Sequence, residues 1–173
     1  MKRHNINIKQ NIAEYFFINP NAKLRVREIE RMLKLPLPSV IRYCKELEKE
    51  GILSVIKIGG VIFYTANWGN EKYHLEKKLN NLRRIYESGI IKYLKQELSN
   101  PPIVLFGSFA KGEDTEESDI DLYIETPSKK KVESEKFEKY GQEWWNPTGK
   151  LFSLHRINPL RFEYFSGVAK DLA

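Results

Sequence analysis

The clearest alternation of apolar and polar residues lies between positions 102 and 125. An apolar run, Ile103–Phe106, stops at Gly107, and a polar stretch with a second glycine, Gly112, follows it. From position 118 to 124 the residues alternate, which is typical of a half-buried strand. One face of this strand would carry Ile120, Leu122 and Ile124, and the other Asp119, Asp121 and Tyr123. The pattern therefore predicts two strands joined by a polar loop.

The first 68 residues show helical periodicity instead. Apolar residues recur every three or four positions over 8–17, 24–35 and 39–50, and prolines or glycines separate these segments. Pro38 suits the first turn of the third helix, and Gly51 ends it. The apolar residues that we expect on the buried faces are Ile12, Tyr15, Phe16, Val26, Ile29, Met32, Leu33, Val40, Ile41, Cys44 and Leu47.

Two β-rich segments, 52–58 and 61–65, follow and are joined by Gly59 and Gly60, which predicts a hairpin. Three helices followed by a hairpin resemble a winged helix-turn-helix domain. The resemblance implies that the third helix enters the DNA major groove and that the hairpin touches the backbone. The candidates for DNA contact are Ser39, Arg42, Tyr43, Lys45 and Lys57, with Arg25, Arg27 and Lys34 as further phosphate ligands. The alternatives are solvated helix faces, or a protein-interaction module.

Positions 71–99 are almost free of helix breakers, and we expect two helices that meet at Ser88 and Gly89. The first would link the two halves of the chain and pair with a second copy, so a homodimer is expected. The second would pack on the sheet that carries the acidic strand. A basic cluster in the first helix is expected to be a solvated face; it consists of Lys77, Lys78, Arg83 and Arg84.

Charge and composition narrow the function. Residues 1–68 carry a net charge of +6, which favours a polyanionic partner, whereas residues 101–173 carry −3, which favours a cation site. The single cysteine, Cys44, fits a reducing compartment and is expected to be a buried core residue. No apolar run is long enough for a membrane span or a secretion signal, so a soluble cytoplasmic protein is expected.

The acidic strand carries the candidate chemistry. Asp119 and Asp121 share one face, and two neighbouring carboxylates repel each other unless a cation lies between them. Their hard oxygen ligands suit Mg²⁺, which in turn binds phosphates. The glycine-serine turn at Gly107 and Ser108 offers backbone N–H groups to such phosphates. We therefore predict a site for a metal-bound nucleoside triphosphate.

Gly107-Ser108, Gly112, Ser118-Asp119 and the second aspartate, Asp121, occur in the order found in the polymerase-beta-type nucleotidyltransferase superfamily. The chain most resembles its minimal nucleotidyltransferases. The resemblance implies that Gly107 and Ser108 hold the triphosphate of ATP and that Asp119 and Asp121 bind Mg²⁺. Lys111 would screen phosphate charge. The acidic residues between the two motifs, Glu113, Asp114, Glu116 and Glu117, are expected to form a solvated loop.

The overall expectation is an α+β chain of three parts. A winged helix-turn-helix would occupy 1–68, a helical linker 69–100, and an α/β nucleotidyltransferase domain with a small mixed sheet 101–173. The family also uses a third carboxylate, on a strand expected here at 149–157 after a helix at 131–144. Ser153 stands where that aspartate should be. His155 and Glu125 are the other candidates, and a closing helix is expected at 159–173.

Two functions remain open at this point. The first is transfer of AMP from Mg-ATP to a hydroxyl of a protein or nucleic acid, as in antitoxins that modify a HEPN-type toxin and regulate their own genes. The second is a transcription regulator whose nucleotidyltransferase domain has lost catalysis and senses nucleotide or mediates assembly. Transfer to a small molecule, as in antibiotic-modifying relatives, is less favoured because no acceptor domain is evident.

Overall fold

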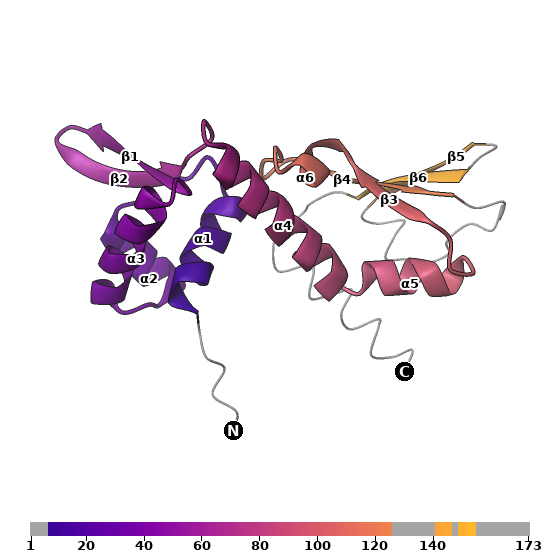
Figure 1. The fold of residues 1–173 in the computed structure, drawn as a ribbon, viewed down its shortest axis with the longest axis horizontal. Helices are drawn as coiled ribbons and strands as arrows, with labels where there is room; N and C mark the ends of the chain where they lie inside the picture. Colours follow the sequence, from indigo (N-terminus) through magenta and orange to yellow (C-terminus); the bar gives the residue numbers. More distant parts are fainter. Residues whose placement is uncertain (1–6, 126–140, 147–148, 155–173) are drawn as a thin grey trace, which may run out of the picture. The chain divides into compact units, whose positions relative to one another are not determined.

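The computed structural model describes residues 7–125, 141–146 and 149–154, and it divides the chain into two compact units, Met1–Lys77 and Lys78–Ala173. The order of elements can be followed in Figure 1. The elements are α1 (Ile8–Ile18), α2 (Val26–Leu33), α3 (Leu37–Lys49), β1 (Leu53–Ile58), β2 (Val61–Ala66), α4 (Glu71–Glu87), α5 (Ile90–Glu97), β3 (Ile103–Phe106), α6 (Gly107–Lys111), β4 (Ile120–Ile124), β5 (Gly141–Asn146) and β6 (Gly149–Leu154).

The three N-terminal helices begin and end at residues whose chemistry explains the boundaries. The side chain of Asn7 accepts a hydrogen bond from the Gln10 backbone N–H at 3.2 Å and so caps α1. Pro38 lies in the first turn of α3, as the sequence predicts, because the missing N–H costs nothing there. Gly51, with φ +80°, follows the end of α3 and takes a left-handed conformation that favours glycine.

The first unit buries one apolar core between its helices and the hairpin. Ile12, Phe16, Val40 and Cys44 are all fully buried in it. The hairpin pairs β1 with β2 in the register Leu53↔Ala66 to Ile58↔Val61, and an isolated bridge joins Leu24 to Tyr64. Helices and hairpin thus occur in the predicted order, while the assignment to the winged helix-turn-helix class stays a prediction.

Two buried positions are predicted wrongly in this unit. Met32 is 53% exposed and Ile41 is 37% exposed, although both fall on apolar positions of the helical pattern. The second helix is also shorter than predicted. Leu24 lies outside it because its backbone N–H and C=O both pair with Tyr64, at 3.0 and 2.8 Å. The extended backbone that this pairing needs is incompatible with a helical turn.

The two predicted helices of the middle segment are α4 and α5, and Gly89 separates them. Gly89 has φ +80°, and the Ser88 hydroxyl donates to the Ile85 carbonyl at 2.7 Å while accepting from the Ile90 N–H at 3.3 Å. The turn therefore satisfies backbone groups at the end of one helix and the start of the next. The prediction of a break at this point is confirmed.

The basic cluster predicted as a solvated face is partly wrong. Lys77 is fully buried and its ammonium donates to the Phe17 carbonyl, while Arg84 is half-buried. Lys78 and Arg83 are exposed, as expected. A charged group withdrawn from water needs partners, and the Phe17 carbonyl at the end of α1 is one for Lys77.

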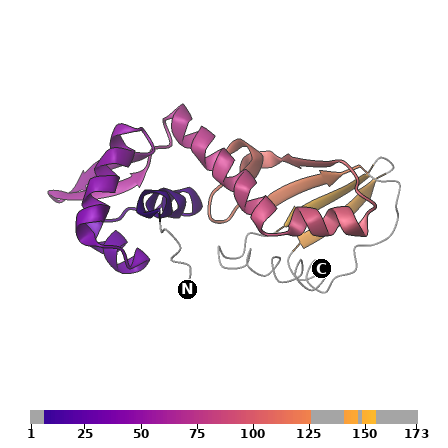
Figure 2. The same ribbon diagram turned by 60° about the horizontal axis from the view of Figure 1, so that its bottom comes forward.

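The second unit contains a four-stranded sheet in the order β3-β4-β6-β5. The helix α5 runs along one face of it, as Figures 1 and 2 show. Ile120, Leu122 and Ile124 face a core formed with Ile90, Leu94 and Phe109, so the predicted alternation of β4 is confirmed. All three described pairings are antiparallel, and the predicted mixed sheet is therefore wrong for this part of the chain.

The segment after β4 departs further from the sequence prediction. The helix predicted at 131–144 is contradicted at its C-terminal end, because Gly141–Asn146 forms strand β5, paired with β6. Trp144 and Trp145 belong to this edge strand, and aromatic residues favour strands. The rest of that predicted helix, 131–140, the end of the predicted strand, 155–157, and the predicted closing helix, 159–173, lie outside the described residues. No helix in the described ranges is both long and apolar enough to cross a membrane.

The buried thiol gives a direct test of the first unit. Cys44 has no exposed surface, and burial raises the pKa of its thiol to about 12. Because the thiolate is the reactive form, Cys44 should not react with an aromatic disulfide reagent at pH 8 in the folded protein. In concentrated guanidinium chloride the same reagent should titrate one thiol per chain. Rapid stoichiometric labelling in native buffer would contradict the burial of α3 against α1.

Candidate active site

The chain turns at Gly107, immediately beside the carboxylate of Asp121. In the antiparallel pair of β3 and β4, Phe106 lies opposite Asp121, so the residue after Phe106 meets this aspartate. Gly107 has φ +74°, and a Cβ atom added to it would lie 2.5 Å from Asp121 Oδ2. Both the dihedral angle and the space exclude a side chain. This backbone and this carboxylate are therefore built to lie against each other.

The predicted polar loop after Gly107 is a short helix, α6. Ser108 is half-buried in its first turn, and Lys111 is exposed at its last residue. The helix ends at Gly112, which has φ +75°, and the Ser108 carbonyl accepts from the Glu113 N–H at 2.9 Å. Gly107, Ser108 and Lys111 thus lie on one short element that begins at the end of β3.

Two residues that the sequence analysis did not assign to the site hold α6 and the loop after it. The Asn81 side-chain amide donates to the Phe109 carbonyl at 3.0 Å and to Asp114 Oδ1 at 2.7 Å. Asp114 is fully buried, so the prediction of a solvated acidic loop is wrong at this position. A buried carboxylate requires such partners. The available signal was Asn80-Asn81 within a helix, because asparagine is a poor helix former.

Asp119 comes to the site through a hydrogen-bonded turn. The Ser118 hydroxyl accepts from the Thr115 N–H at 2.9 Å, and the Ser118 N–H donates to the Thr115 carbonyl at 3.2 Å. Asp119 follows directly and precedes β4, while Asp121 is the second residue of that strand. Both aspartates are half-buried and therefore remain within reach of solvent.

The donor set of this site fits Mg²⁺. Asp121 supplies carboxylate oxygens from β4 and Asp119 supplies them from the residue just before it, and the missing side chain of Gly107 leaves room for the Asp121 carboxylate. Carboxylates are preferred ligands of this ion, and backbone N–H groups are suited to phosphate oxygens. Within the described residues no group of three or more His, Cys, Asp or Glu side chains gathers to hold a metal.

Ser153, which the sequence analysis expects where a third carboxylate would stand, lies on β6 next to the acidic strand. β4 and β6 pair so that Asp121 lies opposite Ser153. Glu125 is exposed just beyond β4, and its N–H donates to the Pro102 carbonyl at 3.1 Å. His155 lies outside the described residues.

The predicted DNA-contact residues lie on α3 and the hairpin. Arg42 and Lys45 are exposed on α3, and Lys57 is exposed on β1. Ser39 and Tyr43 are half-buried, and the Arg42 guanidinium lies 4.3 Å from the centroid of the Tyr43 ring. This stacking, together with Arg42 Nε 3.7 Å from Glu46 Oε1, holds the guanidinium along the helix surface.

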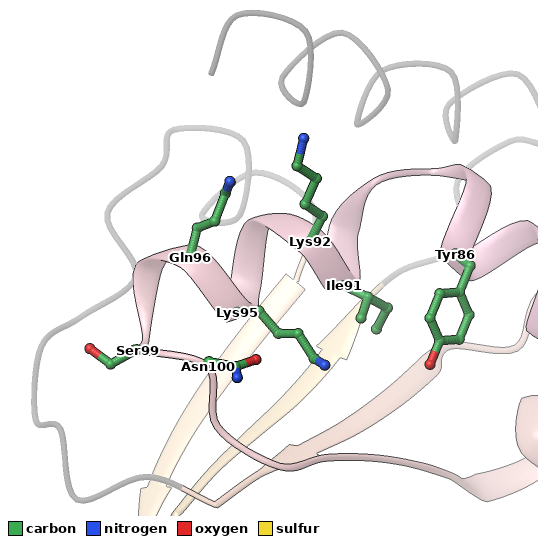
Figure 3. A pocket seen from close by; sticks show the side chains of 7 residues that line it. All are labelled: Tyr86, Ile91, Lys92, Lys95, Gln96, Ser99 and Asn100. Carbon is green, nitrogen blue, oxygen red and sulfur yellow. The ribbon is translucent and has the colours of Figure 1, made fainter. Parts of the chain in front are cut away.

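A separate pocket lies along α5. Its lining is formed by Tyr86, Ile91, Lys92, Lys95, Gln96, Ser99 and Asn100, none of which is a predicted site residue. In Figure 3 the side chains of Lys92 and Gln96 point to one side of α5, and those of Ile91 and Lys95 point to the other, where Tyr86 also lies. The polar groups therefore do not converge on one point, and the pocket is not a second candidate active site.

Comparison with curated proteins finds short matches to methyltransferases. The chain is 56% identical to a ubiquinone biosynthesis O-methyltransferase of Nitrobacter winogradskyi over 39 residues, which are 22% of this chain and 15% of that protein. It is 59% identical to the enzyme of the same name from Rickettsia felis over 34 residues, 20% of this chain and 14% of that protein. The chain thus spans less than a fifth of these relatives. Matches of this length are shorter than a typical domain. No solved structure matches.

Comparison with protein families gives a match that covers the candidate site. Residues 87–170 match the model of the family described as "Nucleotidyltransferase domain". The matched range includes Gly107, Ser108, Asp119 and Asp121, and the register of the sheet brings Gly107 against Asp121. The family match and the site geometry together support a nucleotidyltransferase domain in the second half of the chain.

Proposed function

We propose that this chain binds DNA through its first unit and transfers AMP from Mg-ATP to a hydroxyl group of a protein or nucleic acid through its second. The observation that carries the proposal is the close approach of Gly107 to Asp121, because only a residue without a side chain fits there. A glycine with positive φ against a carboxylate has no evident value for packing. It has a clear value where a phosphate must meet backbone N–H groups and a metal-binding carboxylate together.

The proposed reaction is a direct transfer, in which the protein forms no covalent bond to the nucleotide. The acceptor oxygen attacks the α-phosphorus, a new P–O bond forms, the bond to the β-phosphate oxygen breaks, and pyrophosphate leaves. The acceptor proton passes to a carboxylate of the site or to water. Asp119 and Asp121 would hold Mg²⁺, which neutralises charge on the attacking and leaving oxygens. Gly107 and Ser108 would orient the triphosphate, and Lys111 would screen its charge.

The acceptor we favour is a protein partner such as a HEPN-type toxin, with the DNA-binding unit regulating expression of the pair. The first 68 residues carry a net charge of +6, and Arg42, Lys45 and Lys57 offer exposed positive charge on α3 and the hairpin. Positive side chains at these positions suit phosphate contacts that position a protein on DNA. Incubation of the chain with a co-expressed partner and α-labelled ATP tests the transfer.

A second candidate is a regulator that binds nucleotide without turnover. The observation that favours it is Ser153 opposite Asp121, because a serine supplies neither the charge nor the basicity of a carboxylate. Titration of Mg-ATP against DNA affinity and against pyrophosphate release distinguishes the two. Steady release of pyrophosphate would exclude a regulator without catalysis. A DNA affinity that does not change with the Mg-ATP concentration would exclude a nucleotide sensor.

The two aspartates should be required for Mg-ATP binding. Replacement of Asp119 or Asp121 by Asn keeps the shape of the side chain and removes its charge. A carboxylate about 4 Å from a cation at a protein surface contributes about 4 kcal/mol per unit charge, so each variant should bind Mg-ATP at least about tenfold more weakly. Isothermal titration calorimetry measures the affinity. The matched control is Glu117→Gln, an exposed carboxylate of the same loop. Equal losses in all three variants would contradict the assignment.

Gly107 should tolerate no side chain. Gly107→Ala places a methyl group 2.5 Å from Asp121 Oδ2, so the variant should lose Mg-ATP affinity together with stability. Gly60→Ala is the matched control, because Gly60 has φ +79° but no atom within 4 Å of an added Cβ. Each variant should lose about 1–2 kcal/mol of unfolding free energy from the left-handed backbone. Only Gly107→Ala should lose more than this in denaturant titrations. Unchanged nucleotide binding in Gly107→Ala would contradict the site.

Lys57 should contribute a phosphate contact. Lys57→Ala should weaken binding to a 30-base-pair duplex of arbitrary sequence, and it should lower the slope of log K against log salt concentration by about 0.9. Fluorescence anisotropy at several salt concentrations measures both quantities. The control is Lys78→Ala, which removes the same charge from an exposed position of α4. If both variants showed the same slope of log K against log salt concentration, the effect would come from net charge alone. A phosphate contact by Lys57 on the hairpin would then be excluded.

A further inference from the structure

The helix α4 carries its apolar stripe on the side that faces solvent. Leu75, Leu79, Leu82 and Tyr86 are 54%, 47%, 43% and 64% exposed. Their spacing of four, three and four residues places them in one narrow row along the helix. The opposite side of α4 is the buried one, and besides Tyr73 and Ile85 it holds three polar side chains, which are Lys77, Asn80 and Asn81. An isolated amphipathic helix would show the reverse arrangement.

The row has the spacing of a coiled-coil seam. Successive intervals of four and three residues are those of the a and d positions of a heptad repeat. With Leu79 and Tyr86 at a and Leu75 and Leu82 at d, the flanking e positions are Glu76 and Arg83. The flanking g positions are Glu71, Lys78 and Ile85. Residues at e and g set the orientation in which two such helices pair.

The flanking charges decide between the two orientations of a homodimer. In a parallel pair, g positions meet e positions of the partner, so Lys78 would meet Arg83 of the second copy and Glu71 would meet its Glu76. Both contacts join like charges. In an antiparallel pair, e meets e and g meets g. Glu76 then meets the oppositely charged Arg83 twice. Lys78 meets no like charge, because the matching g position is held by Ile85, which is buried in the core of its own chain.

We propose that α4 is the interface of an antiparallel homodimer, in which Leu75, Leu79, Leu82 and Tyr86 of two copies pack together with Leu79 against Leu82. The occupant of the exposed stripe is a second copy of this chain. The stripe is self-complementary about a two-fold axis, because the layers Leu75–Tyr86 and Leu79–Leu82 each occur twice. The proposal does not depend on nucleotide transfer or on DNA binding.

Sedimentation velocity of the full chain tests the interface. The wild-type chain should sediment as a dimer at micromolar concentrations, and Leu79→Glu combined with Leu82→Glu should sediment as a monomer. Ile62→Glu is the matched control, since Ile62 is an exposed apolar residue of β2, 49% exposed, outside α4. It should leave the dimer intact. A wild-type chain that stays monomeric at 100 micromolar, or a seam variant that stays dimeric, overturns the proposal.

Charge reversal tests the orientation and guards against variants that fail to fold. Glu76→Arg and Arg83→Glu should each weaken the antiparallel dimer about tenfold, and the double reversal should restore it. A parallel dimer predicts the opposite, because each single reversal would then turn like-charge contacts into attractive ones. Lys92→Glu on α5 changes the net charge as Arg83→Glu does and should have no effect. Strengthening by either single reversal overturns the antiparallel arrangement.

Discussion

The candidate site depends on the contact between the Gly107 backbone and the Asp121 carboxylate. β3 must end where β4 places its second residue, and the register that pairs Phe106 with Asp121 does this. A positive φ at Gly107 then turns the chain into α6, with Asp121 Oδ2 in the space of the missing side chain. Asn81 holds the other end of α6 and the loop beyond it. The turn at Gly107 is thus supported from both sides, as preorganised sites require.

Local patterns in the sequence predict most elements around this contact. Alternation identifies β4, and glycines mark the ends of β3 and α6, because these features are set by neighbouring residues. The hydrogen-bond partners of buried polar groups are not determined by neighbouring residues in the sequence. Asp114 is held by Asn81, 33 positions away, and Lys77 by the Phe17 carbonyl, 60 positions away. No periodicity reveals such partners, and both residues read as solvated charges in the sequence.

The exposed leucines of α4 illustrate a second limit of the sequence. Periodicity shows that Leu75, Leu79 and Leu82 share one face, but it does not show what covers that face. The structure places them in solvent and puts polar residues on the buried side. Sequence predictions of burial failed at Met32 and Ile41 for a related reason, since an apolar residue at a helical position can face solvent at little cost. Only the three-dimensional arrangement distinguishes a core position from an interface position.

Nucleotidyl transfer is the central claim, and the fate of the two labelled ends of ATP tests it most directly. The chain and its co-expressed partner would be incubated with Mg²⁺ and ATP labelled at either the α- or the γ-phosphorus, and protein and nucleic acid would then be separated under denaturing conditions. We expect the α-label to become covalently attached to an acceptor and the γ-label to be released in pyrophosphate. Nucleotidyl transfer would be contradicted if the γ-label became covalently attached to the acceptor. It would also be contradicted if neither label became attached and no pyrophosphate formed.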